Sequence, residues 1–561
     1  MDDVDAVQAQ IARTMLETGD WVTARLDGVA YLEKSPLIYW LMAASFRVFG
    51  VHDWAARLPL ALVVVLLCWV TYRIGKWGFD PQAGVYSGVV LATSVGLYLF
   101  TRILIPDAAL TLTITVALWA WMRLLEDDTE QPRRWAVLMG ASLGCGLLLK
   151  GLIAAVFPIL AGFTYMACTR QAFDRASWRR MRLPLVLGLA MLVAVPWHVL
   201  AMLANPPLFA FSMHSGPGEY RGFFWFYFFN EHLLRFLNLR YPRDYNTVPR
   251  ALFWALNLVW LFPWSAYLPG TIKLSYGRST RAARLRLLAL CWIGTVMLFF
   301  TFSTTQEYYS MPIYPAMALL IGSTLAEQKW TRVGSRTLAV IFASLCTVMV
   351  AILVLVAKTP TNGELADALA QHPEMYTLSL GHMGDLTLAA FAYLRLPLAI
   401  AAVACALCAA GAVFSRDRLG ATVAVLAAGM ILFFQAARIA LIRFDPYLGS
   451  YPLAQKLLQS PPGDLIEADS YYSFSSVFFY TNRKALLLNG RNNNLEYGSY
   501  APNAPAVFID DAGFAARWRS PQRYYLLANE PDLPQINAVV GGARSHLVQR
   551  SSGKVLLSNL P

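Results

Sequence analysis

The stretch LPLALVVVLLCWVTYRIGK, residues 58–76, decides the structural class of this chain. Its apolar part is long enough to cross a bilayer as a helix, because about 20 apolar residues span the hydrocarbon core. It ends in Arg73 and Lys76, and basic residues concentrate on the cytoplasmic side of membrane helices. The sequence therefore predicts a transmembrane helix over about 56–75 whose C-terminal end faces the cytoplasm.

The composition of the whole chain agrees with this prediction. Hydrophobic residues make up 57% of the 561 positions and charged residues only 14%, which is more apolar than a soluble protein of this size. The net charge of +12 comes from short basic clusters between apolar segments, so it indicates membrane topology and not nucleic-acid binding. A disulfide framework is not expected, because every cysteine lies inside an apolar segment. The seven cysteines are Cys68, Cys145, Cys168, Cys291, Cys346, Cys405 and Cys408.

About twelve spans are expected in this chain, which is thus predicted to be an α-helical polytopic membrane protein. The apolar segments are 56–75, 82–100, 106–124, 134–149, 151–168, 183–204, 250–272, 286–302, 308–325, 336–357, 393–414 and 419–441. Basic clusters lie in every second connection between spans, which places those connections in the cytoplasm. The clusters are Arg73 and Lys76, Arg123 with Arg133 and Arg134, Arg170 to Arg182, Arg278 to Arg286, Lys329 to Arg336, and Arg416 with Arg418.

The alternate connections are predicted to lie outside, on the periplasmic side of a plasma (inner) membrane. They include the segment before residue 56, the long stretch 205–249 and the tail after residue 441. The acids that open the chain then also face outward, although no apolar span precedes them. We therefore expect one more span upstream of the given sequence; the alternative is a protein of twelve spans with a translocated N-terminus.

The tail from about 446 to 561 changes character. Turn-forming stretches such as NGRNNN and PNAP separate short runs typical of strands. These runs are SVFFY, KALLLN, AVFID, RYYLLA and KVLLSN. We expect three parts: an outer loop with interfacial helices over 1–55, a transmembrane domain over 56–441 and a small extracytoplasmic α/β domain over 446–561.

The stretch YLEKSPLIYW begins at Tyr31 and places Glu33 and Lys34 just before Pro36. Proline is favoured in the first turn of a helix, so a helix is predicted to begin here and to run to about Phe49. It is short and amphipathic, as expected for a helix lying in the membrane interface. A lysine and a tyrosine at such a helix start can hold a lipid phosphate. Alternatively, the lysine only extends toward water and the tyrosines belong to an aromatic belt.

Further ionisable residues occur where the predicted spans meet the outer side. Asp107 follows a proline at the start of a span, where it either caps the helix or marks a functional site. The stretch NEHLLRFL carries His232 and Arg235, and Glu231 stands at the i, i+4 spacing from Arg235, so an ordinary surface pair is the alternative there. The stretch QEYYSMPIYP places Glu307 and its following tyrosines on an outer loop.

Five motifs carry a family resemblance over residues 1 to about 325. They are GDWVTARLDGVAYLEKSPLIYW, VHDWAARLP, IPD, NEHLLRFL and EYYSMPIYPAMALLIG, in this order. The set resembles the membrane glycosyltransferases of the GT-C type, which include protein O-mannosyltransferases and the aminoarabinose transferase that modifies lipid A. The resemblance implies that a sugar is taken from a polyprenyl phosphate at the outer face of the membrane and passed to an acceptor there.

The resemblance also implies roles for individual residues. Lys34 and Tyr31 would contact the donor phosphate, and Tyr309 matches a family tyrosine near it. On chemical grounds, Arg235 is expected to be a further cation for that phosphate. Asp107 matches an acidic position in the cavity wall. The remaining members of the implied outer cavity are Glu33, His232 and Glu307.

The opening stretch departs from the family pattern. The family has an Asp-Glu pair in its first outer loop, and an ungapped count from Met15 puts Val4 and Asp5 at these positions. Either Asp5 or Asp2 takes the role of the acid after a small shift of register, or this chain works without that group. Val4 is also the main argument for a further alternative, a family member without catalytic activity.

Glycosyl transfer sets the chemistry that these groups must perform. The transition state resembles an oxocarbenium ion, and cations such as Lys34 and Arg235 would stabilise the leaving phosphate. A hydroxyl acceptor, on a glycolipid or a protein, needs a general base, which Asp5, Asp2 or Asp107 could supply, whereas a phosphate acceptor needs none. A single displacement inverts the anomeric carbon.

The sequence contains few signs of a cofactor, and it leaves a second class of function open. No nucleotide fingerprint is present and no metal-ligand spacing is strong, so the remaining metal hypothesis is a divalent ion held by Glu33 and His232. The alternative to an enzyme is a multi-span lipid or sugar transporter or flippase. That class predicts paired halves and polar or broken helices at the bilayer midplane.

Overall fold

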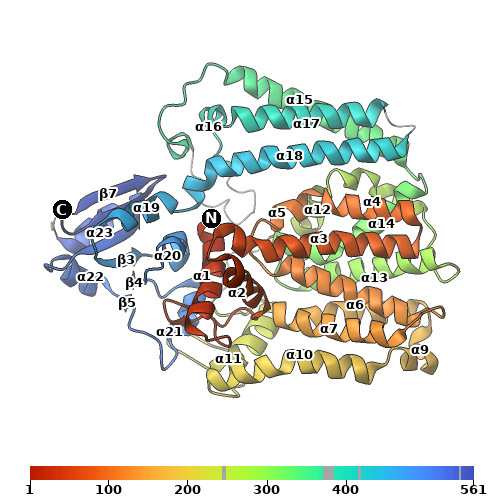
Figure 1. The fold of residues 1–561 in the computed structure, drawn as a ribbon, viewed down its shortest axis with the longest axis horizontal. Coiled ribbons are helices and arrows are strands. Elements are labelled where there is room, and N and C mark those ends of the chain that lie inside the picture. The colour runs from red at the N-terminus through yellow and green to blue at the C-terminus, as the bar shows by residue number, and fades with distance from the viewer. Residues whose placement is uncertain (243–247, 370–383, 415–417, 542–544) are drawn as a thin grey trace.

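A bundle of long helices with a smaller domain at one end makes up this protein (Figure 1). The computed structural model describes residues 1–242, 248–369, 384–414, 418–541 and 545–561. The helices of the bundle run side by side, and α1, α2, α21 and the C-terminal sheet gather at one end, which we call the domain end (Figure 1). The short helix α9 (Arg175–Arg180), which carries part of a basic cluster, lies at the opposite end (Figure 1).

Seven helices among the described residues are long and apolar enough to cross a membrane, or eight if one bent pair counts as a span. The seven are α3 (Asp53–Gly78), α6 (Asp107–Leu125), α10 (Leu183–Ala204), α13 (Arg281–Phe302), α15 (Thr331–Leu355), α17 (Arg395–Phe414) and α18 (Leu419–Leu448). The bent pair is α12 (Arg250–Trp260) and the 3-10 helix Trp264–Lys273, which meet at 101°. The prediction of a helical polytopic membrane protein is confirmed.

The other expected spans are shorter, interrupted or, in the case of α7, less apolar. They are α4 (Pro81–Ala92) with α5 (Val95–Phe100), α7 (Pro132–Lys150), α8 (Ile153–Cys168) and α14 (Tyr314–Ala326). The first of these starts as its sequence dictates, because Asp80 accepts a hydrogen bond from the Ala83 N–H and Pro81 occupies the first helical position. The count of twelve spans therefore stays a prediction.

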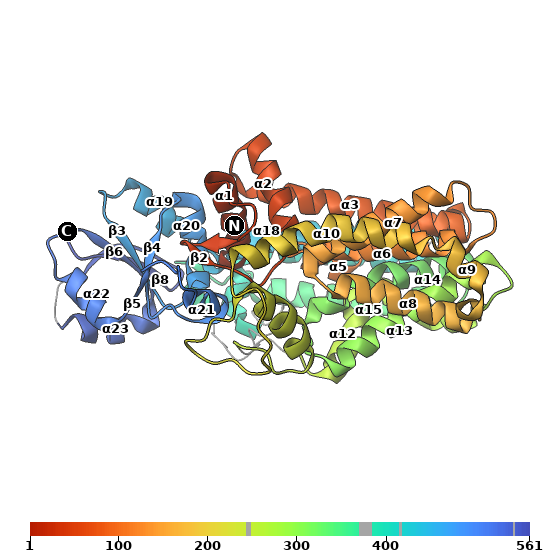
Figure 2. The same ribbon diagram turned by 90° about the horizontal axis from the view of Figure 1, so that it is seen from below.

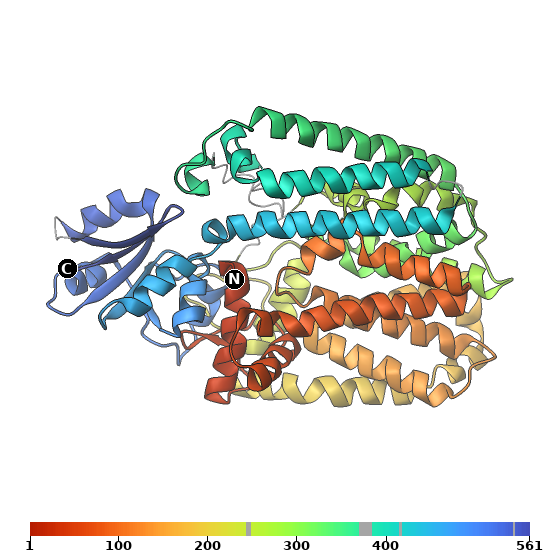
Figure 3. The same ribbon diagram turned by 45° about the horizontal axis from the view of Figure 1, so that its top comes forward.

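Burial separates the central helices from those that face lipid. In α6, 72% of the apolar window is buried inside the protein, whereas in α15 the buried share is 11%. Helices α15, α17 and α18 form a layer along one side of the bundle (Figure 3). Their exposed apolar side chains need a hydrocarbon environment, so α6 lies in the core of the bundle and α15 on its lipid-facing side.

The first 50 residues cover the domain end of the bundle. Helix α1 (Asp3–Thr18) packs on α2 (Leu37–Phe49), and the small hairpin of β1 (Arg25–Leu26) and β2 (Val29–Ala30) joins them. The predicted helix up to Phe49 is confirmed as α2. A second element at this end, α11 (Gly222–Phe224), continues into a π-helix over Trp225–Leu234 (Figure 1).

The C-terminal α/β domain is confirmed and contains a six-stranded mixed sheet. Its strands lie in the order β5-β4-β3-β6-β8-β7, with parallel pairing among β5, β4, β3 and β6 and antiparallel pairing for β8 and β7. The strands are β3 (Asp464–Ala468), β4 (Ala485–Leu488), β5 (Phe508–Ile509), β6 (Tyr524–Asn529), β7 (His546–Ser551) and β8 (Lys554–Ser558). Helices α19 (Tyr451–Gln459) and α20 (Ser475–Thr481) cover one face, and α22 (Asp511–Trp518) and α23 (Leu533–Val540) cover the other (Figure 2).

One predicted strand of this domain is wrong. The run SVFFY forms the helix α20, and not a strand. Ser475, Ser476, Val477, Phe478 and Phe479 are all buried in this helix, so the run has no alternation of buried and exposed residues. The strand that precedes this helix in the chain is β3, and its sequence DLIEA is less apolar than SVFFY. A short continuous apolar run suits a buried helix as well as a strand, and here the run packs as a helix on α1 and α19.

Candidate active site

A cavity of about 350 Å³ opens at the domain end of the bundle. Six of the residues selected from the sequence line it: Glu33, Lys34, Asp107, His232, Arg235 and Tyr309. They come from separate elements, namely the loop before α2, the start of α6, the π-helix and the 3-10 helix Glu307–Ile313. The tertiary fold thus brings residues that are up to 276 positions apart to one cavity.

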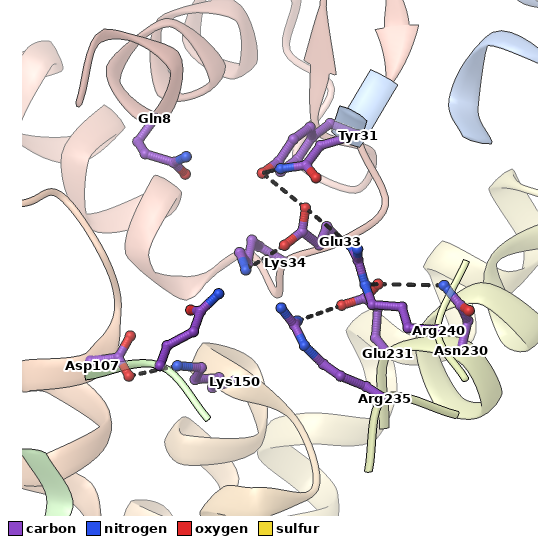
Figure 4. A network of polar contacts seen from close by, with 12 residues as sticks. Gln8, Tyr31, Glu33, Lys34, Asp107, Lys150, Asn230, Glu231, Arg235 and Arg240 are labelled. Atoms are coloured by element: carbon purple, nitrogen blue, oxygen red, sulfur yellow. Dashed lines mark hydrogen bonds and ion pairs between the residues drawn. The ribbon is translucent and has the colours of Figure 1, made fainter. Parts of the chain in front are cut away.

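Ion pairs link the charged side chains around this cavity (Figure 4). Lys34 Nζ lies 2.6 Å from Glu33 Oε1, and Arg235 Nη1 lies 2.8 Å from Glu231 Oε2. Arg240 joins the two carboxylates, with its Nε 2.6 Å from Glu231 Oε1 and its Nη2 3.7 Å from Glu33 Oε2. These contacts link the loop before α2 to the segment that follows α10.

A second ion pair forms the opposite wall, between Asp107 and Lys150 (Figure 4). Lys150 Nζ lies 2.5 Å from Asp107 Oδ1, and its ammonium is 4.7 Å from the centre of the Tyr309 ring. Asp107 is the first residue of α6 and Lys150 the last of α7, so each charge also complements the dipole of its own helix. Four cations thus face three carboxylates, which leaves a net positive site for an anion.

Glu33 is ionised in this environment. Burial alone would raise the pKa of its carboxyl, but the charges of Lys34, Arg240 and Arg235 outweigh it and lower the pKa to about 2. A carboxyl with such a pKa holds no proton at neutral pH. Glu33 therefore orients the cations and is unsuited to donate a proton.

His232 lines the cavity, and backbone groups engage both nitrogens of its ring. Its Nδ1 lies 2.6 Å from the Tyr227 carbonyl oxygen, and its Nε2 accepts a hydrogen bond of 3.0 Å from the Leu152 N–H. Burial lowers the pKa of its imidazole to about 4, so the ring is neutral. Both nitrogens are engaged by backbone, which leaves no lone pair for a metal. Within the described part of the chain, no group of three or more His, Cys, Asp or Glu side chains could hold a metal ion.

The acids of the opening stretch do not line the cavity. Asp2 caps α1 by accepting a hydrogen bond from the Asp5 N–H. Asp5 is fully buried, where it pairs with Arg57 and accepts a 2.7 Å hydrogen bond from the Leu104 N–H. Asp5 therefore stabilises the loop that leads to α6. Its carboxylate is not part of the cavity lining, where a general base would have to lie.

Two other selected residues lie outside the cavity lining. Tyr31 is buried beneath it, where its hydroxyl lies 3.4 Å from Glu33 Oε2 and 3.0 Å from the Tyr472 hydroxyl. Glu307 is buried in the 3-10 helix next to Tyr309. Tyr31 therefore reaches the ion pairs of the cavity through Glu33.

Lys150 and Arg240 are the functional candidates that the sequence reasoning missed. Lys150 is the single charged residue between the apolar segments 134–149 and 151–168, on a connection predicted to lie outside. A lysine on that side contradicts the positive-inside pattern, and this signal could have identified it. Arg240 carries no such signal in the sequence.

The other half of the cavity is apolar. Leu149, Ile153, Val156, Phe157, Phe299 and Phe300 line it. A net positive mouth beside a hydrocarbon-like wall fits an amphiphile with an anionic head and an apolar chain.

Comparison with known proteins agrees with this geometry. Residues 33–199 match the family described as dolichyl-phosphate-mannose-protein mannosyltransferase. The resemblance to GT-C membrane glycosyltransferases is confirmed. The crystal structure of ArnT from Cupriavidus metallidurans bound to undecaprenyl phosphate has the same fold, with a TM-score of 0.79 at 23% identity, and the match covers 99% of this chain and 93% of that chain.

Two curated relatives extend the GT-C comparison. The undecaprenyl phosphate-alpha-4-amino-4-deoxy-L-arabinose arabinosyl transferase of Enterobacter sp. (strain 638) is 25% identical over 384 residues, covering 65% of this chain. Arabinosyl transferase 1 of the same kind from Pseudomonas fluorescens (strain Pf0-1) is 29% identical over 389 residues, covering 67% of this chain. The matched part spans 61% of the length of each relative.

Proposed function

We propose that this protein is an inverting glycosyltransferase that takes a sugar from a polyprenyl phosphate. The observation that carries the proposal is the cavity in which Lys34, Lys150 and Arg235 stand beside an apolar wall. The cations suit the phosphate of the donor and the wall suits the start of its hydrocarbon chain. The fold shared with an ArnT structure that holds undecaprenyl phosphate supports the same ligand class.

The finer proposal concerns the sugar and the acceptor. The curated relatives are named for 4-amino-4-deoxy-L-arabinose carried on undecaprenyl phosphate. We propose the same pentose donor here, with lipid A as the acceptor and the plasma (inner) membrane as the site of action. We also propose the division into an outer loop over 1–55, a transmembrane domain over 56–441 and an extracytoplasmic domain over 446–561.

In the proposed reaction, an acceptor oxygen attacks the anomeric carbon of the sugar. The bond from that carbon to the donor phosphate oxygen breaks, and its electron pair stays on the polyprenyl phosphate. Lys34, Lys150 and Arg235 stabilise the charge that grows there, and Tyr309 lies beside the Lys150 ammonium. A phosphate acceptor arrives ionised, whereas a hydroxyl acceptor would pass its proton to Asp107.

The positions of the charged groups favour an enzyme over a transporter. They gather at one end of the bundle, at the first residue of α6 and the last of α7, and not along the middle of these helices. A transporter would place its polar groups near the midplane, within broken helices. The cavity therefore suits a reaction at the membrane surface.

The direct test is glycosyl transfer by the purified full chain in lipid nanodiscs. With undecaprenyl-phosphate aminoarabinose and lipid A, we expect mass spectrometry to detect lipid A carrying one added aminopentose, and NMR of the product to show the inverted anomeric configuration. Undecaprenyl-phosphate mannose serves as the control donor and an unfolded peptide as the control acceptor. Absence of transfer from either donor to either acceptor would contradict the proposal.

The orientation of the C-terminal domain is tested separately. The parity of spans and the basic residues at 416 and 418 place the tail after residue 441 on the periplasmic side. Alkaline phosphatase fused after Pro561 is therefore expected to be active, because it folds only outside the cytoplasm. A fluorescent reporter that folds only in the cytoplasm is the matched control, and fluorescence from that fusion would contradict the orientation.

A further inference from the structure

Helix α21 (Asn493–Ser499) of the C-terminal domain packs directly on the segment that leads to Lys34. A Cβ atom added to Gly498 would lie 1.9 Å from the Ala30 carbonyl oxygen in β2. The two backbones therefore touch at a position that only glycine fits. Three residues after Ala30, the chain reaches Glu33 and then Lys34. Helix α21 therefore packs against the segment that carries the first charged residues of the cavity.

The same helix packs on the outer segment that carries Glu231 and Arg235. Tyr497 is buried with its ring 4.2 Å from the ring centre of Phe226. Its hydroxyl accepts a 2.8 Å hydrogen bond from the Arg221 N–H and donates one of 3.1 Å to the Gly222 carbonyl oxygen. Tyr497 thereby holds the start of the helical run that ends at the cation site.

Two hydrogen-bonded chains connect α21 to the charged groups. In the first, Asn494 donates a 2.9 Å hydrogen bond to the Tyr472 hydroxyl, which lies 3.0 Å from the Tyr31 hydroxyl. Tyr31 in turn lies 3.4 Å from Glu33 Oε2, and Glu33 pairs with Lys34. This chain joins the C-terminal domain to the first half of the site.

The second chain runs through Tyr241. Its hydroxyl donates a hydrogen bond to Glu496, and its backbone N–H donates one of 2.8 Å to Asn230 Oδ1. Asn230 also donates from its side-chain amide to the Tyr241 carbonyl oxygen, at 2.5 Å. The neighbours of these two residues in the chain are Glu231 and Arg240, which form the 2.6 Å ion pair of the site.

We propose that α21 positions the donor-phosphate site, with Glu496 and Tyr241 as the positioning pair. The proposal rests on the glycosyltransferase function proposed above. Lys34 and Arg235 stand on segments some 200 residues apart, and α21 contacts both segments. The C-terminal domain therefore sets the distance between these two cations, which must bind the same phosphate. It affects donor binding without contacting the donor.

The test compares full-length variants in nanodiscs. Tyr241→Phe removes the hydroxyl that reaches Glu496 and keeps the ring, and Glu496→Ala removes the acceptor. For each, we expect the KM for the polyprenyl-phosphate sugar and the Kd for undecaprenyl phosphate to rise about tenfold, as for one charge-assisted hydrogen bond. The kcat is expected to stay near the wild-type value, because neither residue touches the reacting atoms.

Three further variants separate positioning from general damage. Glu496→Gln keeps a carbonyl that can accept from Tyr241 and is expected to restore most of the affinity. The double variant Tyr241→Phe/Glu496→Ala is expected to bind no more weakly than Glu496→Ala, because the contact between Tyr241 and Glu496 is already lost in that single variant. Tyr525→Phe removes another hydroxyl of the same domain, one that donates to the Pro461 carbonyl oxygen at 2.8 Å, and is expected to change nothing.

The two proposals fail in different ways. If the wild-type protein neither binds undecaprenyl phosphate nor transfers a sugar, the proposed function is wrong. If the wild-type protein does both, and Tyr241→Phe matches Tyr525→Phe in KM and Kd, the positioning role of α21 is overturned. A fall in kcat with unchanged KM and Kd would also overturn it.

Discussion

Replacing Lys34 by methionine is expected to lower glycosyl transfer about 10- to 150-fold. Methionine keeps most of the aliphatic stem but removes the charge that faces the cavity. One charge-assisted contact to a phosphate contributes roughly 1.5 to 3 kcal/mol, and this range corresponds to the stated loss if the contact acts fully in the transition state. Glu33 keeps its ion pair with Arg240, so folding should survive.

Two companion variants make the Lys34 experiment decisive. Lys34→Arg restores the charge but not the compact geometry of an ammonium, so partial recovery is expected. Lys273→Met removes a lysine that lies over the Trp330 ring, away from the cavity, and should leave transfer unchanged. The measurements are purified yield and initial rate with the polyprenyl-phosphate sugar. Wild-type transfer by Lys34→Met would exclude this residue from the donor site.

Replacing Lys150 by methionine is expected to destabilise the protein by about 3 to 5 kcal/mol, the usual cost of removing one partner of a buried ion pair. The Asp107 side chain is only 3% exposed, and without the lysine its charge is left largely uncompensated. The N-terminus of α6 offsets part of this cost. The midpoint of thermal unfolding in detergent measures the effect.

The double variant Lys150→Met/Asp107→Leu identifies the cause of that loss. Removing both charges leaves no unpaired ion, so most of the stability should return, while transfer should not. Lys76→Met, which changes an exposed lysine at the end of α3, is the matched control and should keep the wild-type midpoint. If the double variant were as unstable as Lys150→Met, the ion pair would not be the source of the effect.

Local sequence patterns predicted much of the architecture. Long apolar segments gave the membrane helices, because a bilayer requires about 20 apolar residues and satisfied backbone hydrogen bonds. Pro36 and the following amphipathic run predicted α2, and turn-rich stretches between apolar runs predicted the C-terminal α/β domain. The failure at SVFFY has the same origin, since a short apolar run suits a strand or a buried helix and only its neighbours decide.

The candidate site was only partly predictable. Lys34, Asp107 and Arg235 were selected because charges beside apolar spans are costly and mark function, and all three line the cavity. Asp5 was selected by counting along a motif, yet its carboxylate is committed to Arg57 and the Leu104 N–H. Arg240 was missed, because nothing in its immediate neighbours shows that it bridges two distant carboxylates.

The sequence by itself determined the class of the molecule: a helical polytopic membrane protein with a C-terminal α/β domain. These properties follow from local terms, the transfer of apolar side chains into lipid and the periodicity of helices and strands. Only the tertiary structure decided which charges meet. The pairing of Lys150 with Asp107, the engagement of both His232 nitrogens and the docking of α21 all depend on contacts between segments far apart in the chain. Such contacts are set by the packing of the whole fold, and no local pattern encodes them.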